Sequence, residues 1–348
     1  MSSDIAPSGS ALSDSGPLYS AYDELLLDLD GTLYRGPDAI PGAVAALADL
    51  PTRLLYVTNN ASRSPRDVAE HLTELGFAAS DSDVVTSAQA AARLLAQRFS
   101  AGAIVLVVGA QALVDEVAAV GLVPVREFDA ERPPVAAVHG HSPDTGWRLL
   151  AEETLAIRAD AWWVATNIDS TLPTERGLVL GNGSMVAAVR HATGAEPVVA
   201  GKPARPLMLD AQERNGAQRP LVVGDRLDTD IEGANAVGFD SLLVLTGVST
   251  PADVLRAVPE QRPTFIADEL AALRSPAAQC RVLAPDVNSA HPMSYDSGVL
   301  TVGTAVDGRV DHARLVRDVA VVAWQHSEFE RVTSNDPEVA DILSRWKL

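Results

Sequence analysis

Short apolar runs alternate with amphipathic segments through most of this 348-residue sequence. The apolar runs have the length of buried strands, and the segments between them have helical spacing. This alternation predicts an α/β fold built on parallel sheets. Strands are expected at 24–30, 53–58, 103–108, 135–139, 161–166, 197–200, 220–224, 240–245 and 264–267, and helices at 41–50, 64–75, 88–99, 112–120, 146–158, 205–215, 229–237 and 268–273.

The length favours two or three domains. Residues 1–19 are rich in Ser, Gly and Pro and are expected to form a flexible tail. The alternating pattern of 20–82 resumes at 197–274, so these two segments are expected to form one domain. The second alternating set, 83–196, would be inserted into it. The remaining residues, 275–348, have weak strand patterns at Cys280–Ala284 and Val299–Thr304 and one clear helix pattern at Asp311–Gln325, which predicts a small α+β domain.

Acidic residues outnumber basic ones, 46 to 27, for a formal charge of −19. This balance argues against a nucleic-acid or anionic-membrane partner. No apolar run approaches the ~18 residues of a membrane span. The single cysteine, Cys280, cannot form an intramolecular disulfide and fits a reducing compartment, so a cytoplasmic location is expected. An anionic substrate would need a local cation. Only two residues are lysines, Lys202 and Lys347.

The first candidate motif is the DLDGT sequence that begins at Asp28, at the carboxyl end of the first apolar strand. Ligands of open α/β folds bind at this end of the strands. Asp28 and Asp30 share one face, roughly 6.6 Å apart, a separation that can bracket a phosphoryl group. Asp28 would attack phosphorus as the nucleophile. Asp30 would protonate the leaving oxygen and later take a proton from water. Taken alone, the pattern also fits an ordinary polar strand end.

Two further motifs offer groups that bind phosphate. Thr58, Asn59 and Asn60 follow the second strand, where a hydroxyl and amides can donate to phosphate oxygens. Lys202, in a Gly-Lys-Pro sequence after the strand at 197–200, would neutralise the nucleophile and the phosphate. A compact ammonium fits such a role better than a guanidinium. Each motif alone also fits an ordinary loop.

The fourth motif is the GDRLDTD sequence that begins at Gly224, after the strand at 220–224. Mg²⁺ prefers oxygen ligands and keeps several waters, so a few carboxylates suffice to hold it. Asp225 is the expected ligand, together with Asp28 and the backbone oxygen of Asp30. Asp230 would hold a metal-bound water or brace Lys202.

Together, the four motifs in this order resemble the haloacid-dehalogenase superfamily of phosphatases over about residues 22–274. The resemblance implies a Rossmann-like parallel-sheet core and Mg²⁺ as the cofactor. The inserted block lies between the TNN and GKP motifs, where the p-nitrophenyl-phosphatase-like branch carries a large α/β cap. Thr166–Pro173, followed by Gly177, is similar to the cap signature of that branch. The extra C-terminal segment resembles the acetyltransferase-like tail of actinobacterial glycerol-3-phosphate phosphatases. It lacks the glycine-rich loop that binds coenzyme A, so we expect no acetyltransferase activity.

The resemblance implies a phosphomonoesterase acting on a small phosphorylated metabolite, first of all glycerol 3-phosphate. Phosphoglycolate, pyridoxal phosphate and nucleotide monophosphates are alternative substrates. A phospho-accepting signalling module and a phosphomutase are alternative functions, but a signalling domain has no use for an acid at Asp30 or for a large cap. Cap residues 167–177 and 139–144 are expected to set substrate choice. In residues 139–144, His139 and His141 are expected to belong to a loop and not to a metal site. A homo-oligomer is also expected.

Overall fold

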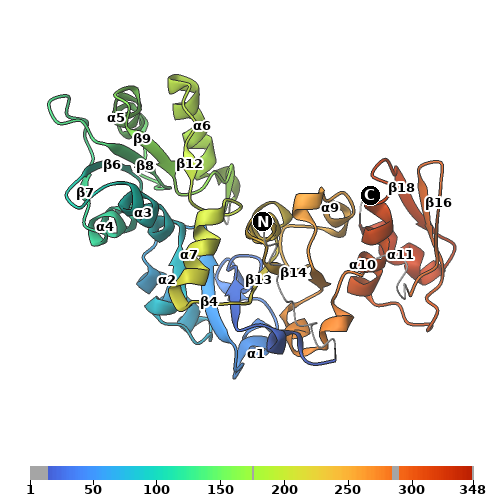
Figure 1. Ribbon diagram of the computed structural model, residues 1–348. Coiled ribbons are helices and arrows are strands. Elements are labelled where there is room, and N and C mark those ends of the chain that lie inside the picture. Colours follow the sequence, from blue (N-terminus) through green and yellow to red (C-terminus); the bar gives the residue numbers. More distant parts are fainter. Residues whose placement is uncertain (1–14, 175, 284–289, 347–348) are drawn as a thin grey trace, which may run out of the picture.

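The chain forms three parts that lie side by side in the computed structural model, which describes residues 15–174, 176–283 and 290–346. Figure 1 shows a central sheet domain, called the core below, with a second sheet domain on one side and the C-terminal residues on the other. The second sheet domain, which carries strands β6 to β12, is called the cap. This arrangement is the α/β fold with a cap that the sequence predicts.

The core contains six parallel strands in the order β15-β14-β13-β1-β4-β5. In the middle strand, Leu25 and Leu27 belong to one hydrophobic cluster and Leu26 belongs to another. Because successive side chains of a strand point to opposite faces, both faces of this sheet are buried. The strands are β1 (Glu24–Leu27), β4 (Arg53–Thr58), β5 (Val84–Thr86), β13 (Pro220–Gly224), β14 (Asp240–Val244) and β15 (Phe265–Ala267).

Helices cover both faces of the core sheet. The helix after β4 starts where the sequence predicts: Ser64 accepts the backbone N–H of Asp67, and the Asp67 carboxylate accepts that of Ser64. The predicted helix at 229–237 begins earlier, as a π-helical turn, η3 (Leu227–Ile231). The predicted helix at 268–273 is the 3₁₀ turn η5 (Leu270–Arg274). The α-helices of the core are α1 (Ala43–Leu47), α2 (Pro65–Glu74), α3 (Ser87–Arg98), α7 (Arg205–Asn215), α8 (Glu232–Val237) and α9 (Pro251–Leu255).

The cap has its own sheet of five parallel strands in the order β12-β9-β8-β6-β7. One face of this sheet shares a hydrophobic cluster with the core, and the other face packs on cap helices. A two-stranded hairpin, β10 (Thr171–Thr174) and β11 (Gly177–Leu180), projects from it. The remaining elements are β6 (Ile104–Val108), α4 (Gln111–Ala119), β7 (Val123–Val125), β8 (Ala136–His139), α5 (Trp147–Arg158), β9 (Trp162–Ala165), α6 (Asn182–Thr193) and β12 (Val198–Val199).

Two strands lie in a different sheet from the one that the predicted domain boundaries imply. β5 falls in the segment 83–196 predicted as cap, yet it pairs with β4 in the core sheet. β12 falls in the segment 197–274 predicted as core, yet it pairs with β9 in the cap sheet. Both strands lie where the chain passes from one domain to the other. Their apolar pattern reports burial and carries no information about the partner strand.

The C-terminal part is a small α+β unit, as predicted, but it is not independent of the core. Its helix α10 (His312–Ala323) packs against β15 and α9, and one hydrophobic cluster joins them. Arg317 also donates to the backbone oxygen of Ile266, at 2.7 Å. The other elements are β16 (Met293–Asp296), β17 (Val299–Val302), β18 (Arg331–Ser334) and α11 (Pro337–Arg345).

Two predictions near the ends of the chain are wrong for the described residues. Residues 280–283 form no strand, although Arg281 makes an isolated bridge to Phe265; Ala284 lies outside the described residues. The tail predicted over 1–19 is ordered before residue 19, because Leu18 is fully buried and its N–H donates to the Ser275 oxygen at 2.8 Å. Residues 1–14 and Lys347 lie outside the description. Within the residues it covers, no helix has the length and apolar character needed to cross a membrane.

Candidate active site

Three of the four predicted motifs meet at the carboxyl edge of the core sheet. β1 lies between β13 and β4, and Leu27 pairs with both Val223 and Tyr56, so the three strands end level with one another. The chain leaves β1 towards β4 on one side, and β13 lies on the other. Such a change in strand order opens a crevice at the strand ends. Asp28, Thr58 and Asp225 occupy this edge.

Lys202 reaches the same edge from the loop that leads from the cap back into the core. Its Nζ donates to Asp28 Oδ1 at 2.5 Å, to Asp230 Oδ1 at 2.7 Å and to the Val57 backbone oxygen at 3.1 Å. These three bonds use all three donors of the ammonium. Burial opposes the charge, but the two carboxylates outweigh it and raise the pKa of Lys202. The only lysine among the described residues is therefore a charged group inside the site.

Three carboxyl groups form an acidic cluster, in which oxygens of Asp28, Asp225 and Asp230 lie within 4.8 Å of one another. Asp225 is fully buried, and burial together with the charges of the other two raises its pKa to about 8. Its Oδ2 accepts the N–H of Val248 at 2.6 Å. Burial and Asp28 also raise the pKa of Asp230, to about 6, although Lys202 opposes the rise. This crowding of acid oxygens fits a small hard cation such as Mg²⁺.

Asp30 lies beyond the end of β1, two residues after Asp28, and is exposed. Partial burial of the carboxyl raises its pKa, and the Gly36 N–H and Arg35 oppose this rise. β1 ends before Asp30 because the chain turns: the N–H groups of Thr32 and Leu33 both donate to the Leu29 oxygen. The turn requires a glycine next. Gly31 has φ +93°, and a Cβ there would lie 2.5 Å from the Asp225 carboxylate.

The Thr-Asn-Asn motif is arranged differently from the prediction for Asn59. Its Oδ1 accepts the Lys202 N–H at 2.8 Å, and its Nδ2 donates to the Lys202 oxygen at 3.0 Å. The amide thus clamps the backbone of the lysine loop instead of pointing at a phosphate position. Thr58 is buried at the edge and its hydroxyl accepts the N–H of Asn60. Asn60 is exposed, with its Oδ1 bound to the Ser62 N–H at 2.8 Å.

The cap contacts this motif through two residues of the cap signature, Asn167 and Asp169, which the sequence linked to substrate choice and not to the Thr-Asn-Asn motif. Asn167 Nδ2 donates to the Asn59 backbone oxygen at 2.8 Å, and Asn59 Nδ2 lies 3.3 Å from an Asp169 carboxylate oxygen. Burial raises the pKa of Asp169, while Arg226 opposes the rise. The position of Asn59 directly after β4 gave no sign of these contacts. The Thr-Asn-x-Asp sequence at 166–169 was the one signal in the sequence that could have indicated these contacts.

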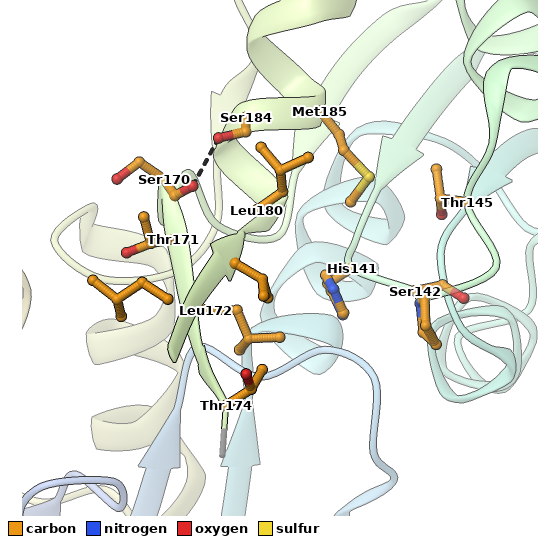
Figure 2. Close-up of a pocket in the computed structure, with 13 residues that line it drawn as sticks. His141, Ser142, Thr145, Ser170, Thr171, Leu172, Thr174, Leu180, Ser184 and Met185 are labelled. Carbon is orange, nitrogen blue, oxygen red and sulfur yellow. Dashed lines mark hydrogen bonds between the residues drawn. The ribbon is translucent and has the colours of Figure 1, made fainter. Parts of the chain in front are cut away.

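The two cap segments expected to set substrate choice line one cavity of about 930 Å³. Figure 2 shows His141, Ser142 and Thr145 on one side of it and the β10–β11 hairpin on the other. His139 does not reach the cavity as a ligand: it is fully buried, with Nδ1 2.7 Å from Glu153. Burial and the neighbouring His139 lower the pKa of His141. The two histidines therefore form no metal site together.

A carboxylate held by a buried lysine, beside further acids at the edge of a parallel sheet and under a cap, defines a metal-dependent phosphohydrolase. A family model described as haloacid dehalogenase-like hydrolase matches residues 25–123, and a HAD-hydrolase-like model matches 199–273. The chain belongs to the haloacid dehalogenase-like hydrolases. It is accordingly a phosphoric monoester hydrolase with Mg²⁺ as its cofactor, and not a signalling module.

Relatives with a named activity or a solved structure cover either nearly the whole chain or about three quarters of it. A Mycobacterium tuberculosis protein named D-glycerol 3-phosphate phosphatase is 50% identical over 340 residues, 94% of each chain. The crystal structure of a glycerol phosphate phosphatase from that organism in complex with magnesium has a TM-score of 0.90 at 50% identity, covering 96% of this chain and 99% of the other. A 4-nitrophenylphosphatase from Thermotoga maritima has a TM-score of 0.67 at 32% identity, covering 74% of this chain and 98% of the other. These likenesses confirm the predicted branch of the family.

Proposed function

We propose that this phosphatase hydrolyses glycerol 3-phosphate to glycerol and phosphate. The observation that carries the proposal is the 50% identity to D-glycerol 3-phosphate phosphatase of M. tuberculosis over 94% of both chains. At this coverage the likeness includes core, cap and C-terminal part together. The cap, which is expected to contact the substrate, is therefore part of the likeness.

The proposed nucleophile is Asp28. Lys202 donates to its Oδ1 at 2.5 Å, which fixes the orientation of the carboxylate. In the first step an Asp28 oxygen forms a bond to phosphorus while the bond from phosphorus to the glycerol oxygen breaks, and Asp30 donates a proton to that oxygen. In the second step a water oxygen attacks phosphorus and Asp30 takes the water proton. The acyl-phosphate bond breaks, releasing phosphate and the Asp28 carboxylate.

The remaining residues hold the charges of this reaction. Bound Mg²⁺ supplies charge neutralisation for the phosphoryl oxygens, and Asp28, Asp225 and the Asp30 backbone oxygen are its proposed ligands. Asp230 accepts the N–H of Arg226 at 3.1 Å as well as Lys202, which suits a supporting role. Thr58 and Asn60 are the proposed donors to the phosphate. We assign Asn59 to positioning Lys202, because its amide is bound to the lysine backbone.

Phosphate release from a panel of phosphomonoesters tests the proposal. With Mg²⁺, kcat/KM for glycerol 3-phosphate is expected to exceed that for phosphoglycolate, pyridoxal phosphate and a nucleotide monophosphate by at least about tenfold, a margin that one or two pocket contacts can supply. Asp28→Asn keeps the shape of the nucleophile without its charge, and it should reduce turnover of every ester to background. A preference for one of the other three esters would reassign the substrate, and turnover by Asp28→Asn would refute the covalent route.

The lone Cys280 and the phosphometabolite substrate support a cytoplasmic location. A homo-oligomer stays a prediction, which light scattering on the purified protein would test.

A further inference from the structure

The cavity of the cap lies beside the loop that follows β4. One wall of the cavity contains His141, which follows Gly140. Gly140 lies close to Ala61, the residue after the Thr58–Asn60 motif: a Cβ added at Gly140 would lie 3.3 Å from the Ala61 side chain. The hairpin wall begins at Ser170, next to Asp169, which contacts Asn59. The residues that precede the two walls, Gly140 and Asp169, therefore lie against the loop that carries Asn59 and Ala61. An ester whose phosphate lies at Asp28 would direct its alcohol into this space.

The lining of the cavity is largely apolar. In Figure 2 the side chains of Leu172, Leu180 and Met185 surround the space that faces His141. Leu180 is 71% exposed, and its hairpin neighbour Leu178 is 72% exposed. Isolated exposed leucines need no explanation, but here they gather on a concave wall beside a catalytic centre. Apolar side chains held open to water in such a place favour a ligand that carries hydrocarbon.

The volume of the cavity exceeds what a glycerol group can fill. At about 30 Å³ for each water-sized group, the six heavy atoms of glycerol would occupy about a fifth of the 930 Å³. The rest of the space adjoins the apolar wall. A substituent on the alcohol could therefore extend along Leu172 and Leu180 without displacing the phosphate.

We infer that this cavity is a subsite for an apolar chain, so that the enzyme also hydrolyses phosphomonoesters whose alcohol carries an alkyl or acyl group. This inference rests on the proposed function, since it places the phosphate at Asp28. Each methylene buried against the hairpin should raise kcat/KM about two- to fourfold. An esterified glycerol 3-phosphate and a simple alkyl phosphate share this chemistry.

The probe is a series of ethyl, butyl and hexyl phosphate, assayed in the full-length protein with Mg²⁺ below the aggregation limit of the esters. We expect kcat/KM to rise at least about tenfold from ethyl to hexyl phosphate. Leu180→Ser and Leu172→Ser should flatten this rise, each compared with its own value for ethyl phosphate. Val306→Ser removes an equally exposed apolar side chain, 78% exposed, from the C-terminal part and should keep the full rise.

A second copy of the chain is the competing occupant of the hairpin surface. A flat series in the wild type would overturn the inference, as would a rise that persists in both hairpin variants. Dimerisation that Leu180→Ser abolishes, together with a flat series, would assign the surface to the second copy. A 1-acyl glycerol 3-phosphate of short chain tests the esterified form directly. If hexyl phosphate is hydrolysed and glycerol 3-phosphate is not, the subsite stands and the proposed substrate is wrong.

Discussion

The Nζ of Lys202 lies 2.5 Å from Asp28 Oδ1, and the lysine side chain is only 3% exposed. The same nitrogen binds Asp230 and the Val57 backbone oxygen, so one ammonium joins the end of β1, the strand β4 and the turn after β13. A buried charge is costly unless it is paired and hydrogen-bonded, and this one is satisfied on all three donors. The geometry explains why the body of an arginine-rich chain keeps a lysine at this position.

Lys202→Arg should keep the positive charge and lose much of the rate. A guanidinium is wider and presents a planar fork, which cannot point donors at Asp28, Asp230 and the Val57 oxygen together. We expect kcat/KM to fall at least tenfold, which corresponds to a loss of about 1.4 kcal/mol of transition-state stabilisation. Arg205→Lys, at an exposed position nearby, is the matched control and should be mild. Wild-type kinetics for Lys202→Arg would show that the lysine is not part of the site.

Asn59→Ala should lower kcat more than it raises KM. The variant removes the two bonds that clamp the Lys202 backbone and the contact with Asp169, so the lysine loop would move while the phosphate donors stay in place. A loss of about tenfold or more in kcat is expected. Asn235→Ala is the control, because Asn235 also makes two side-chain bonds to backbone oxygens, and both of these partners, Glu260 and Arg262, lie outside the proposed site. Equal kinetic effects in both variants would mean a general loss of stability only.

Removal of metal should abolish activity. EDTA leaves the acids of the cluster crowded within 4.8 Å without a cation, and Mg²⁺ should restore the rate. Ca²⁺ should bind but support little turnover, since its longer and looser coordination misplaces the attacking carboxylate. Mg²⁺ should also raise the Tm of the wild type, and this rise should be smaller in Asp225→Asn. Full activity in metal-free buffer would contradict the assignment of Asp225.

Deleting residues 276–348 should destabilise the whole protein, although the segment holds none of the proposed catalytic residues. The deletion uncovers apolar side chains of β14, β15 and α9 and removes Ala277 and Cys280 from the core cluster. Leu315→Ala, at a fully buried position in α10, tests this in the intact chain with an expected loss of about 2–5 kcal/mol in unfolding free energy. Leu283→Ala is the control, at a 38% exposed position, and should cost little. A stable, active 1–275 fragment would contradict the shared core.

The sequence predicted local structure well where local forces decide it. β4, β13 and α7 have the predicted bounds, because apolar runs and helical periodicity are set by burial of the residues themselves. α2 begins where the capping sequence at Ser64 says it should. The order of the four motifs was enough to place Asp28, Lys202 and Asp225 together, since parallel strands end on the same edge of a sheet.

The sequence was least informative in the C-terminal part. The strands β16 and β18 and the helix α11 were not predicted there. The two strands are only 4 residues long each, which leaves little pattern to read. α11 carried an available signal, because Asp336 caps its start and Pro337 follows. β16 and β17 form a hairpin joined by Ser297 and Gly298. β17 also pairs with β18, which lies far along the chain, and local propensity does not report such a pairing.

What the sequence alone determined is therefore the fold class and the strand-end motifs that carry the proposed reacting groups. Tertiary structure decided that β5 pairs in the core and β12 in the cap, because strand pairing is a contact between distant segments. It also decided that Asn59 binds the lysine backbone and Asp169, a choice that depends on which side chains arrive within about 3 Å in the folded chain. The residue types of the site can be read from the sequence, but the hydrogen-bond partner of each polar side chain is set only when the core and the cap pack together.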